Sequence, residues 1–394
     1  MNKITALFFV GLMLFFASCS KPETRKSQSV LDSPENHISM GMKMFDSGDY
    51  EKAKFEFDDA IKIKANDKEH AGAYAGLGMY FAIKGDEEKA EKNAKKAIEL
   101  NDKLPLGYIS FGRTIGYLNA GKDSEDWLDD AIVKFDRAIK LADEQRDIKA
   151  QSKAYYFKGI VAKQGYAFGR AKDAFTKVIE LNSEYQTEAN KEWEKVQMIE
   201  RAKPGTKAGK KVALMDEIGR GEIAVLFVEE LKINEVLAKK EKKEYDTGYK
   251  APTDPMKYEA DKLVKADAVT DIDNSWAKSW INQVIENGVM EVGPDHKFNP
   301  NEKITRAEFA QMLLRVLVII SNDESLYTKY FGEESSMFPD VRTDHFAYNA
   351  IAVCATRGIM KAEMNGEFGI AKKVSGAEAL LTIRELQNSL RLTF

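Results

Sequence analysis

The chain has 394 residues, of which 44% are hydrophobic, so it is long enough to form two or three domains with substantial cores. Its 59 basic and 63 acidic side chains give a formal net charge of −4. This near balance argues against a nucleic-acid partner, because recognition of a phosphate backbone requires a basic excess.

Residues 1–18 have the pattern of an export signal. Lys3 provides a positive start, residues 4–16 form an apolar run that is too short to span a bilayer comfortably, and small residues precede Cys19. This pattern resembles the signal of bacterial lipoproteins. The resemblance implies a diacylglyceryl lipid on Cys19, attachment to a membrane through that lipid, and no other cofactor. An ordinary secretory signal with an incidental cysteine is the alternative.

Residues 19–34 are polar and cannot bury enough apolar surface to order themselves, so they predict a flexible linker. Fully extended, such a linker reaches roughly 50 Å, at about 3.3–3.6 Å per residue. If Cys19 carries lipid, Cys354 is the only cysteine left, and no intramolecular disulfide can form. The apolar neighbours of Cys354 predict that it is a small buried side chain.

Residues 35–188 contain an internal repeat. The segment from Gly48 to Ala53 recurs from Gly85 to Ala90, and weaker copies follow. Apolar residues at every third or fourth position predict amphipathic helices, with Gly and Asp in the turns between them. The repeating alanines are Ala53, Ala90, Ala131 and Ala171, and the small residues upstream of them are Gly41, Gly78, Gly112 and Gly159.

This pattern resembles the tetratricopeptide repeat, a helix–turn–helix unit. The resemblance implies a helical solenoid of about four units over residues 35–188, in which small residues let paired helices approach and an aromatic side chain fills the gap. It also implies a concave groove for a protein or peptide partner. A rigid spacer with nothing bound in the groove is the alternative.

The next segment, residues 189–231, ends in a short motif that leads into an apolar run. The motif contains Arg220 and Glu222, and Trp193 lies 27 residues before the arginine. Residues 232–267 follow and are rich in Lys and Glu, which predicts a charged insertion with a solvated surface.

Residues 268–320 contain a sharper form of the same motif. Trp276 precedes an apolar helical pattern that ends at Gly288, and a turn-rich loop follows. Thr305 and Glu308 then form a capping-box pattern at the start of a second apolar helix. Residues 335–390 repeat this order more weakly, with the same spacing of 30 residues from the early aromatic to the late motif.

The sharper copy, with its early Asp and Trp and its late Thr-Arg-Ala-Glu, resembles the S-layer homology motif. The segments 189–231 and 335–390 resemble degenerate copies of it, giving three in all. In this family three motifs assemble into a pseudo-trimer whose grooves hold cell-wall polymer. The resemblance therefore implies a set of wall-binding residues: Trp276, Arg306, Glu308, Arg220, Glu222 and Glu378.

The chemistry of these residues suits an acidic glycan. A guanidinium such as that of Arg306 or Arg220 can fork onto a carboxylate or a pyruvyl group, and Trp276 can stack on a sugar. In the third copy Gly376 replaces the arginine, so only Glu378 remains of this set. The alternative for each residue is structural: the arginines and glutamates pin their own helices, and the tryptophan belongs to the core.

No pattern predicts catalysis or a metal site, so the sequence does not predict an enzyme. The four histidines are not spaced as metal ligands and are not paired with cysteines. A nucleophile elbow and a phosphate-binding loop are both absent from the sequence.

The sequence thus predicts a predominantly all-α chain, with a helical solenoid followed by a mostly helical three-motif pseudo-trimer. We expect a lipid-anchored protein of the outer membrane, facing the periplasm, that binds peptidoglycan or a secondary cell-wall polymer while its repeats recruit a protein. One alternative is an adaptor for envelope assembly or secretion, in which the S-layer homology copies are only scaffold. Another is anchorage in a cell with a single membrane.

Overall fold

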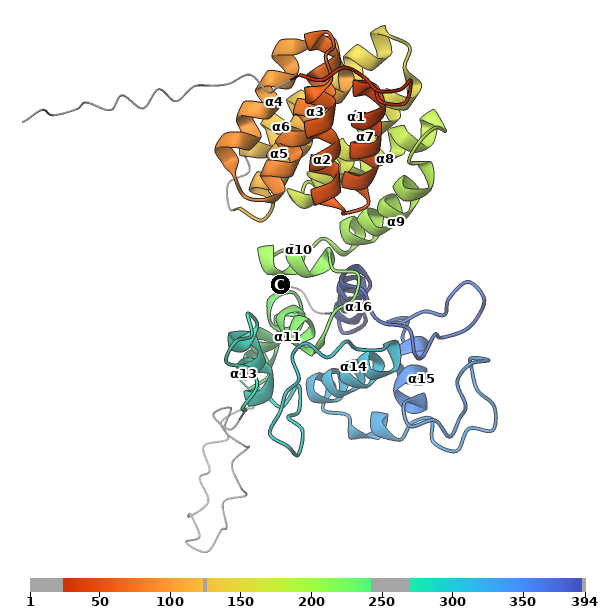
Figure 1. The fold of residues 1–394 in the computed structure, drawn as a ribbon. Coiled ribbons are helices and arrows are strands. Elements are labelled where there is room, and N and C mark those ends of the chain that lie inside the picture. The colour runs from red at the N-terminus through yellow and green to blue at the C-terminus, as the bar shows by residue number, and fades with distance from the viewer. Residues whose placement is uncertain (1–23, 123–125, 242–268, 392–394) are drawn as a thin grey trace, which may run out of the picture. The chain divides into compact units, whose positions relative to one another are not determined.

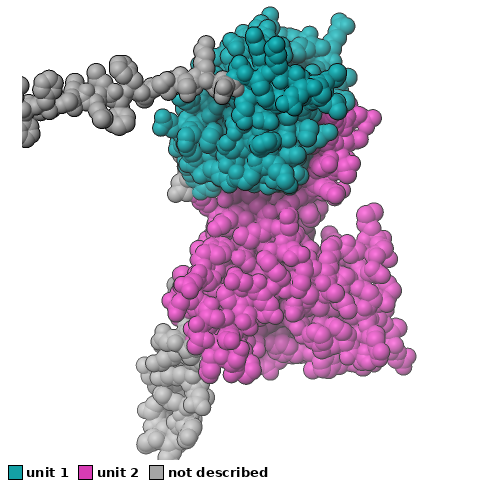
Figure 2. Space-filling view, in the orientation of Figure 1, with its two compact units in different colours: residues 1–165 teal, residues 166–394 magenta. Residues whose placement is uncertain are grey.

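The computed structural model describes residues 24–122, 126–241 and 269–391, so Cys19 lies outside the described residues. Over these ranges the chain forms helices and only isolated β-bridges, which confirms the predicted all-α class. No helix in the described ranges is both long enough and apolar enough to cross a membrane. The chain divides into two compact units, Met1–Gly165 and Tyr166–Phe394 (Figure 2).

Unit 1 is built from antiparallel helical hairpins, in which α1 packs on α2, α3 on α4 and α5 on α6 (Figure 1). The first helix of each hairpin also packs against the first helix of the next. Its elements are α1 (Pro34–Asp46), α2 (Tyr50–Lys62), the 3-10 helix η1 (Asp67–His70), α3 (Ala71–Ile83), α4 (Glu87–Leu100), α5 (Pro105–Asn119), α6 (Asp126–Glu144) and α7 (Ile148–Gln164).

The recurring Gly-Asp pair makes the turn inside each of the first two hairpins. Gly48 and Gly85 have φ angles of +87° and +76°, a left-handed conformation that glycine adopts without strain. The carboxylates of Asp49 and Asp86 then accept the backbone N–H three residues on and cap the following helix. The predicted turns are thus present at these residues.

Aromatic side chains fill the gaps between the helices of unit 1. Phe57 on α2 is fully buried, and a Cβ added at Gly41 or Gly76 would lie within 2.5 Å of its ring. Phe135 on α6 meets Gly112 on α5 in the same way, at 2.7 Å. The small residues therefore make room for the ring of the neighbouring helix, as the repeat pattern predicts. The repeating alanines are also fully buried: Ala53, Ala90, Ala131 and Ala171.

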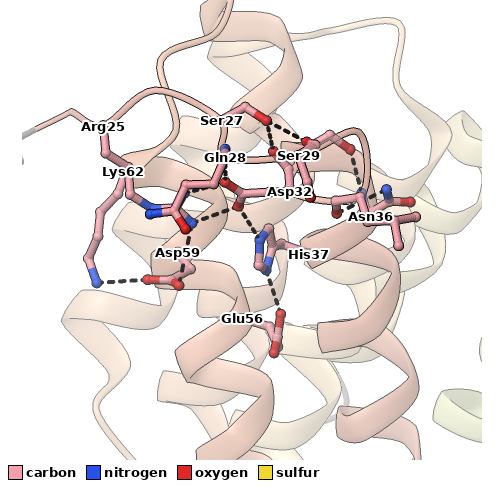
Figure 3. Close-up of polar contacts among 12 residues, drawn as sticks. Arg25, Ser27, Gln28, Ser29, Asp32, Asn36, His37, Glu56, Asp59 and Lys62 are labelled. Atoms are coloured by element: carbon pink, nitrogen blue, oxygen red, sulfur yellow. Dashed lines mark hydrogen bonds and ion pairs between the residues drawn. The ribbon is translucent and has the colours of Figure 1, made fainter.

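Residues 24–33, the end of the predicted linker, lie against the first repeat, and we call this segment the N-terminal strap (Figure 3). The backbone N–H of Arg25 donates to the Lys62 carbonyl oxygen at 2.7 Å, and Lys64 N–H donates back to Arg25 at 2.8 Å. The Arg25 guanidinium donates to both carboxylate oxygens of Asp32 and lies 3.6 Å from Asp59. This guanidinium holds the pKa of Asp32 well below its usual range.

His37 connects the strap to α1 and α2. Its Nε2 lies 3.0 Å from Asp32 and its Nδ1 lies 2.6 Å from Glu56 (Figure 3). Because both partners are carboxylates, both ring nitrogens must donate, which requires the imidazolium form. Burial alone would lower the pKa of His37, but the hydrogen bonds to Asp32 and Glu56 outweigh it and raise that pKa.

Unit 2 begins with the hairpin of α8 and α9, so the unit boundary at Gly165 falls within the fourth predicted repeat. The charged insertion is described only as far as α12, and the rest of it lies outside the described residues. The elements of unit 2 are α8 (Phe168–Leu181), α9 (Gln186–Ala202), α10 (Lys207–Ala213), α11 (Arg220–Glu229), α12 (Ile233–Glu241), α13 (Lys278–Glu286), α14 (Arg306–Ser321), the 3-10 helix η3 (Glu324–Tyr327), α15 (Tyr348–Thr356) and α16 (Gly376–Ser389).

Three equivalent backbone positions close the centre of unit 2 into a ring. Ile304 N–H donates to the Ile218 carbonyl at 3.2 Å, Val374 donates to Ile304 at 3.2 Å, and Ile218 donates to Val374 at 3.0 Å. Each of the three side chains is buried and stands two residues before a late motif. The helices follow the same cycle, since α11 packs on α13, α14 on α15, and α16 on α9 and α10.

Candidate functional site

The loop before each of the last two late motifs is held by an early aspartate. Asp271 accepts the backbone N–H groups of Phe298 and Asn299 at 2.9 and 2.7 Å. Asp340 accepts those of Phe368 and Gly369, both at 2.7 Å. Burial alone would raise the pKa of Asp340, but these N–H groups outweigh it and lower that pKa.

Arg220, at the start of α11, fixes the loop of the second copy. Its Nε donates to the Phe298 carbonyl at 2.7 Å, and its Nη2 donates to the Glu291 carbonyl at 2.8 Å. The guanidinium also lies 4.8 Å from the centre of the Phe298 ring. Burial lowers the pKa of Arg220, with several carboxylates acting in the opposite sense from a distance. No carboxylate of the described chain forms an ion pair with this guanidinium.

Arg306, at the start of α14, repeats this arrangement on the loop of the third copy. Its Nε donates to the Phe368 carbonyl at 2.8 Å and its Nη2 to the Lys361 carbonyl at 2.7 Å, and it lies 4.8 Å from the Phe368 ring centre. Two contacts are new, because Nη1 forms an ion pair with Glu378 and lies 4.0 Å from the carboxylate of Glu363. Arg306 is only 6% exposed. Each arginine thus serves the copy that follows it.

The arginine is missing from the third copy because the ring leaves no room for it. A Cβ at Gly376 would lie 1.7 Å from the carbonyl oxygen of Val212, a backbone atom of the first copy. The backbone N–H of Gly376 donates instead to the Met215 carbonyl at 2.9 Å. The substitution that the sequence presents as degeneration is thus required by the close approach of two backbones.

The glutamates of the late motifs differ in what their carboxylates bind. Glu308 accepts Thr305 N–H at 2.6 Å and the Thr305 hydroxyl at 2.8 Å, which is the predicted capping box. Glu222 likewise accepts Gly219 N–H at 2.8 Å. The Glu378 carboxylate does not cap its own helix in this way and turns toward Arg306.

Trp276 is 40% exposed and lies beside the late motif of the first copy. Its indole N–H donates to Glu222 at 3.2 Å, and the Lys211 ammonium lies 4.4 Å from the ring centre. Trp280 packs edge-on against it at 5.6 Å. Trp193, the earlier tryptophan of unit 2, donates instead to the Thr176 hydroxyl at 3.1 Å.

Two equivalent grooves open beside the two arginines. The first groove has a volume of about 470 Å³ and the second a volume of about 410 Å³. Most of their lining residues correspond at an offset of 70 in residue number. The polar side chains of the first groove are Arg220, Glu291, Lys297, Asn299, Glu302, Glu308, Gln311 and Arg315. Those of the second are Asp216, Arg306, Lys361, Glu363, Lys372, Lys373, Ser375, Glu378, Thr382 and Glu385.

The structure therefore brings Arg220 and Glu308 together in the first groove, and Arg306 and Glu378 in the second. Glu222 pairs with Trp276 outside both linings. Sequence reasoning did not identify Lys297, Gln311 or Arg315, although the repeat with an offset of 70 residues aligns most of the lining. No cluster of three or more potential metal ligands occurs in the described ranges.

Comparisons with known proteins agree with both resemblances. Residues 270–310 and 338–380 match the S-layer homology domain family, and residues 71–104 match the tetratricopeptide repeat family. These are binding and repeat domains without catalytic function. The first predicted copy, residues 189–231, is not among the matched segments.

Several characterised proteins share one or the other segment. Endo-1,4-beta-xylanase A of Thermoanaerobacterium saccharolyticum is 35% identical over 101 residues, and amylopullulanase of Thermoanaerobacterium thermosulfurigenes is 36% identical over 93. These alignments cover 26% and 24% of this chain but only 8% and 4% of the two enzymes. The enzymes match only in their S-layer homology regions.

The photosystem I assembly protein Ycf3 of Prochlorococcus marinus is 26% identical over 108 residues, which are 26% of this chain and 62% of that protein. A solved chain from the functional characterization of Pseudomonas aeruginosa pilF covers 53% of this chain and 91% of its own length, at 19% identity and a TM-score of 0.32. The S-layer homology match associates the chain with the cell envelope or surface, and the two domain types bind wall polymers and proteins respectively.

Proposed function

We propose that unit 2 binds an acidic polymer of the cell envelope in the first groove. The observation that carries this proposal is the Arg220 guanidinium, which lies in a groove of about 470 Å³ without a carboxylate partner in the described chain. The exposed Lys297 ammonium lines the same groove. A carboxylate or pyruvyl group on a wall glycan can pair with a guanidinium held in this way.

We also propose that unit 1 recruits a protein or peptide at the cell envelope. The tetratricopeptide match at residues 71–104 supports this role, since such repeats bind proteins. The lipid on Cys19, and outer-membrane placement facing the periplasm, complete the proposal. They rest on the sequence pattern at residues 1–19 and on Ser20, which fits sorting to the outer membrane. The whole chain then links a membrane to peptidoglycan or a wall-linked polymer.

Co-sedimentation with purified sacculi tests the wall-binding role. The chain without residues 1–19 retains every described residue and should pellet with sacculi that carry their wall polymers. Arg220→Gln should abolish pelleting, because it removes the charge from the first groove. Arg342→Gln is the matched control, since Arg342 is 85% exposed, pairs with Asp344 and lines neither groove. Unchanged pelleting of Arg220→Gln would reject this groove as the binding site.

A second candidate is an adaptor for envelope assembly, in which unit 1 does the work and unit 2 is scaffold. The likeness of 108 aligned residues to a photosystem I assembly protein favours it. The absence of an arginine from the third copy does not favour it, because the backbone contact at Gly376 explains that absence. Failure of the unaltered chain to pellet with any sacculus preparation would favour this candidate.

A further inference from the structure

We infer that Glu378 occupies the second groove as an internal carboxylate, so that only the first groove accepts an external acidic ligand. Glu378 then determines how many ligands unit 2 binds. This inference rests on the proposed function, because it assumes that an arginine in the first groove receives an acidic group.

The two arginines differ at one nitrogen, Nη1. Both use Nε and Nη2 on two carbonyl oxygens of the following loop, and both lie 4.8 Å from a phenylalanine ring centre. The remaining nitrogen, Nη1, is bound by Glu378 in the second groove, where the Glu363 carboxylate, itself paired with Lys372, also lies 4.0 Å from it. In the first groove, no hydrogen bond from Nη1 of Arg220 joins it to any described residue. The difference lies at the atom that would meet a ligand.

Local chemistry explains why the two grooves differ. Glu308, the residue of the first groove that corresponds to Glu378, is held away from Arg220 by two hydrogen bonds from Thr305. Ser375 takes the place of Thr305 in the third copy, and its hydroxyl accepts Glu378 N–H at 3.2 Å without binding the carboxylate. The Glu378 carboxylate is therefore available to the Arg306 guanidinium.

Two of the three other cations of the second groove are also engaged within the protein, whereas Lys361 forms no ion pair with the described chain. Lys372 pairs with Glu363 at 2.6 Å, and Lys373 donates to the Lys303 carbonyl at 2.8 Å. In the first groove, Glu302 occupies the position that corresponds to Lys372 in the second groove. The first groove also contains Lys297, which forms no ion pair with the described chain. An acidic ligand would have to displace Glu378 from the second groove, whereas it meets a free guanidinium arm in the first.

Removing the internal carboxylate should open the second groove. The test starts from Arg220→Gln, in which the first groove is disabled, and adds Glu378→Gln or Glu378→Ala. Binding to sacculi should return, with an affinity about tenfold above that of Arg220→Gln alone, the effect expected from one charge-assisted hydrogen bond. Glu385→Gln in the same background removes the same charge from the second groove without touching Arg306, and it should not restore binding.

The outcomes separate this inference from the proposed function. If the unaltered chain pellets, Arg220→Gln does not, and neither Glu378 variant restores binding, the proposed function stands and the inference is overturned. Equal recovery with Glu385→Gln would also overturn it, since net charge alone would then explain the gain. If the unaltered chain fails to pellet and the Glu378 variants succeed, the first groove is rejected and the role of Glu378 is supported. If neither the unaltered chain nor any variant pellets with sacculi, both the proposed function and the inference about Glu378 are rejected. Melting temperatures of the two Glu378 variants show whether either is misfolded.

Discussion

The two units arrange their repeated motifs differently, as an open stack of hairpins in unit 1 and as a closed ring in unit 2. In unit 1 each hairpin packs on the next, so a glycine such as Gly41 has to suit only its own neighbour, Phe57. In unit 2 three motifs close a ring, so the third motif must also fit the first, and Gly376 lies against the backbone of Val212. In this closed arrangement the third copy must fit the first as well as the second, and at Gly376 that contact leaves no room for the arginine of the other two copies. The loss of the third arginine is therefore a consequence of closure.

Gly376→Ala should have the largest effect on the closed ring of unit 2. The added Cβ would meet a backbone carbonyl at 1.7 Å, and no side-chain rotation relieves that contact. We expect a loss of about 3 kcal/mol or more in the unfolding free energy of unit 2, measured by urea denaturation. The control is Gly169→Ala on α8, where the nearest contact is the flexible end of Glu200 at 3.4 Å. A small effect at Gly376 would contradict the closed ring.

The matching change in unit 1 should have a smaller and more local effect. In Gly76→Ala the new Cβ would lie 2.3 Å from the Phe57 ring, which can shift with its helix, so we expect a loss of about 1–3 kcal/mol. Hydrogen exchange should show faster opening in α1 to α4 and little change in α6, because each repeat contacts only its neighbours. Gly107→Ala, with its nearest contact at 3.9 Å, is the control. Uniform acceleration across unit 1 would argue against an open stack.

Loss of a loop aspartate should lower the stability of unit 2 by less than Gly376→Ala does. Asp340→Ala removes the acceptor for Phe368 and Gly369 N–H, and we expect a loss of about 2 kcal/mol in the stability of unit 2. The pKa of Asp340 is lowered, so its contribution is present above its ordinary pKa and is lost as pH falls through the lowered value. Denaturation at pH 7 and at pH 3 checks both points. The difference between the unaltered chain and Asp340→Ala should shrink at the lower pH.

The smallest effect concerns the N-terminal strap. His37 has a raised pKa, so its stabilisation of the strap is fully present below about pH 6.5 and is lost as pH rises through the raised value. The pKa of Asp32 is lowered, so its own stabilisation of the strap is fully present above its ordinary pKa and is lost as pH falls through the lowered value. Hydrogen exchange of the Arg25 and Lys64 amides, corrected for intrinsic rates, should therefore be slower at pH 5.5 than at pH 8. His37→Gln should remove that difference, and its persistence would exclude His37 as the cause.

Much of the fold was predictable because its signals are local. The Gly-Asp turns, the buried alanines and the Thr305–Glu308 capping box each depend on residues a few positions apart. The contacts of the strap were not predictable, because Arg25 and Asp32 look like ordinary linker residues until α1 places His37 beside Asp32 and α2 places Asp59 beside Arg25. Composition alone gives no sign of such partners.

The candidate site was predictable in its residue types but not in its pairings. The family pattern indicated Arg306 and Arg220, yet each guanidinium acts on the copy that follows, which only the closed ring reveals. The Glu378 carboxylate turns toward Arg306, whereas the Glu308 carboxylate accepts the Thr305 hydroxyl, and the sequence does not indicate this difference. Trp276, expected to stack on a sugar, keeps an exposed face while its N–H is committed to Glu222.

The ring also bears on the order in which the chain folds. Unit 1 rests on contacts between neighbouring hairpins, which form quickly and can arise while the chain is still being synthesised. In unit 2 the side chain of Arg384 on α16 donates to the carbonyls of Ala202 and Lys203, which lie 182 and 181 residues earlier. Until α16 has emerged, the first and second motifs cannot complete their packing, and their apolar surfaces stay exposed. We therefore expect unit 2 to depend longer on chaperones than unit 1, with α16 setting the moment at which the second groove forms.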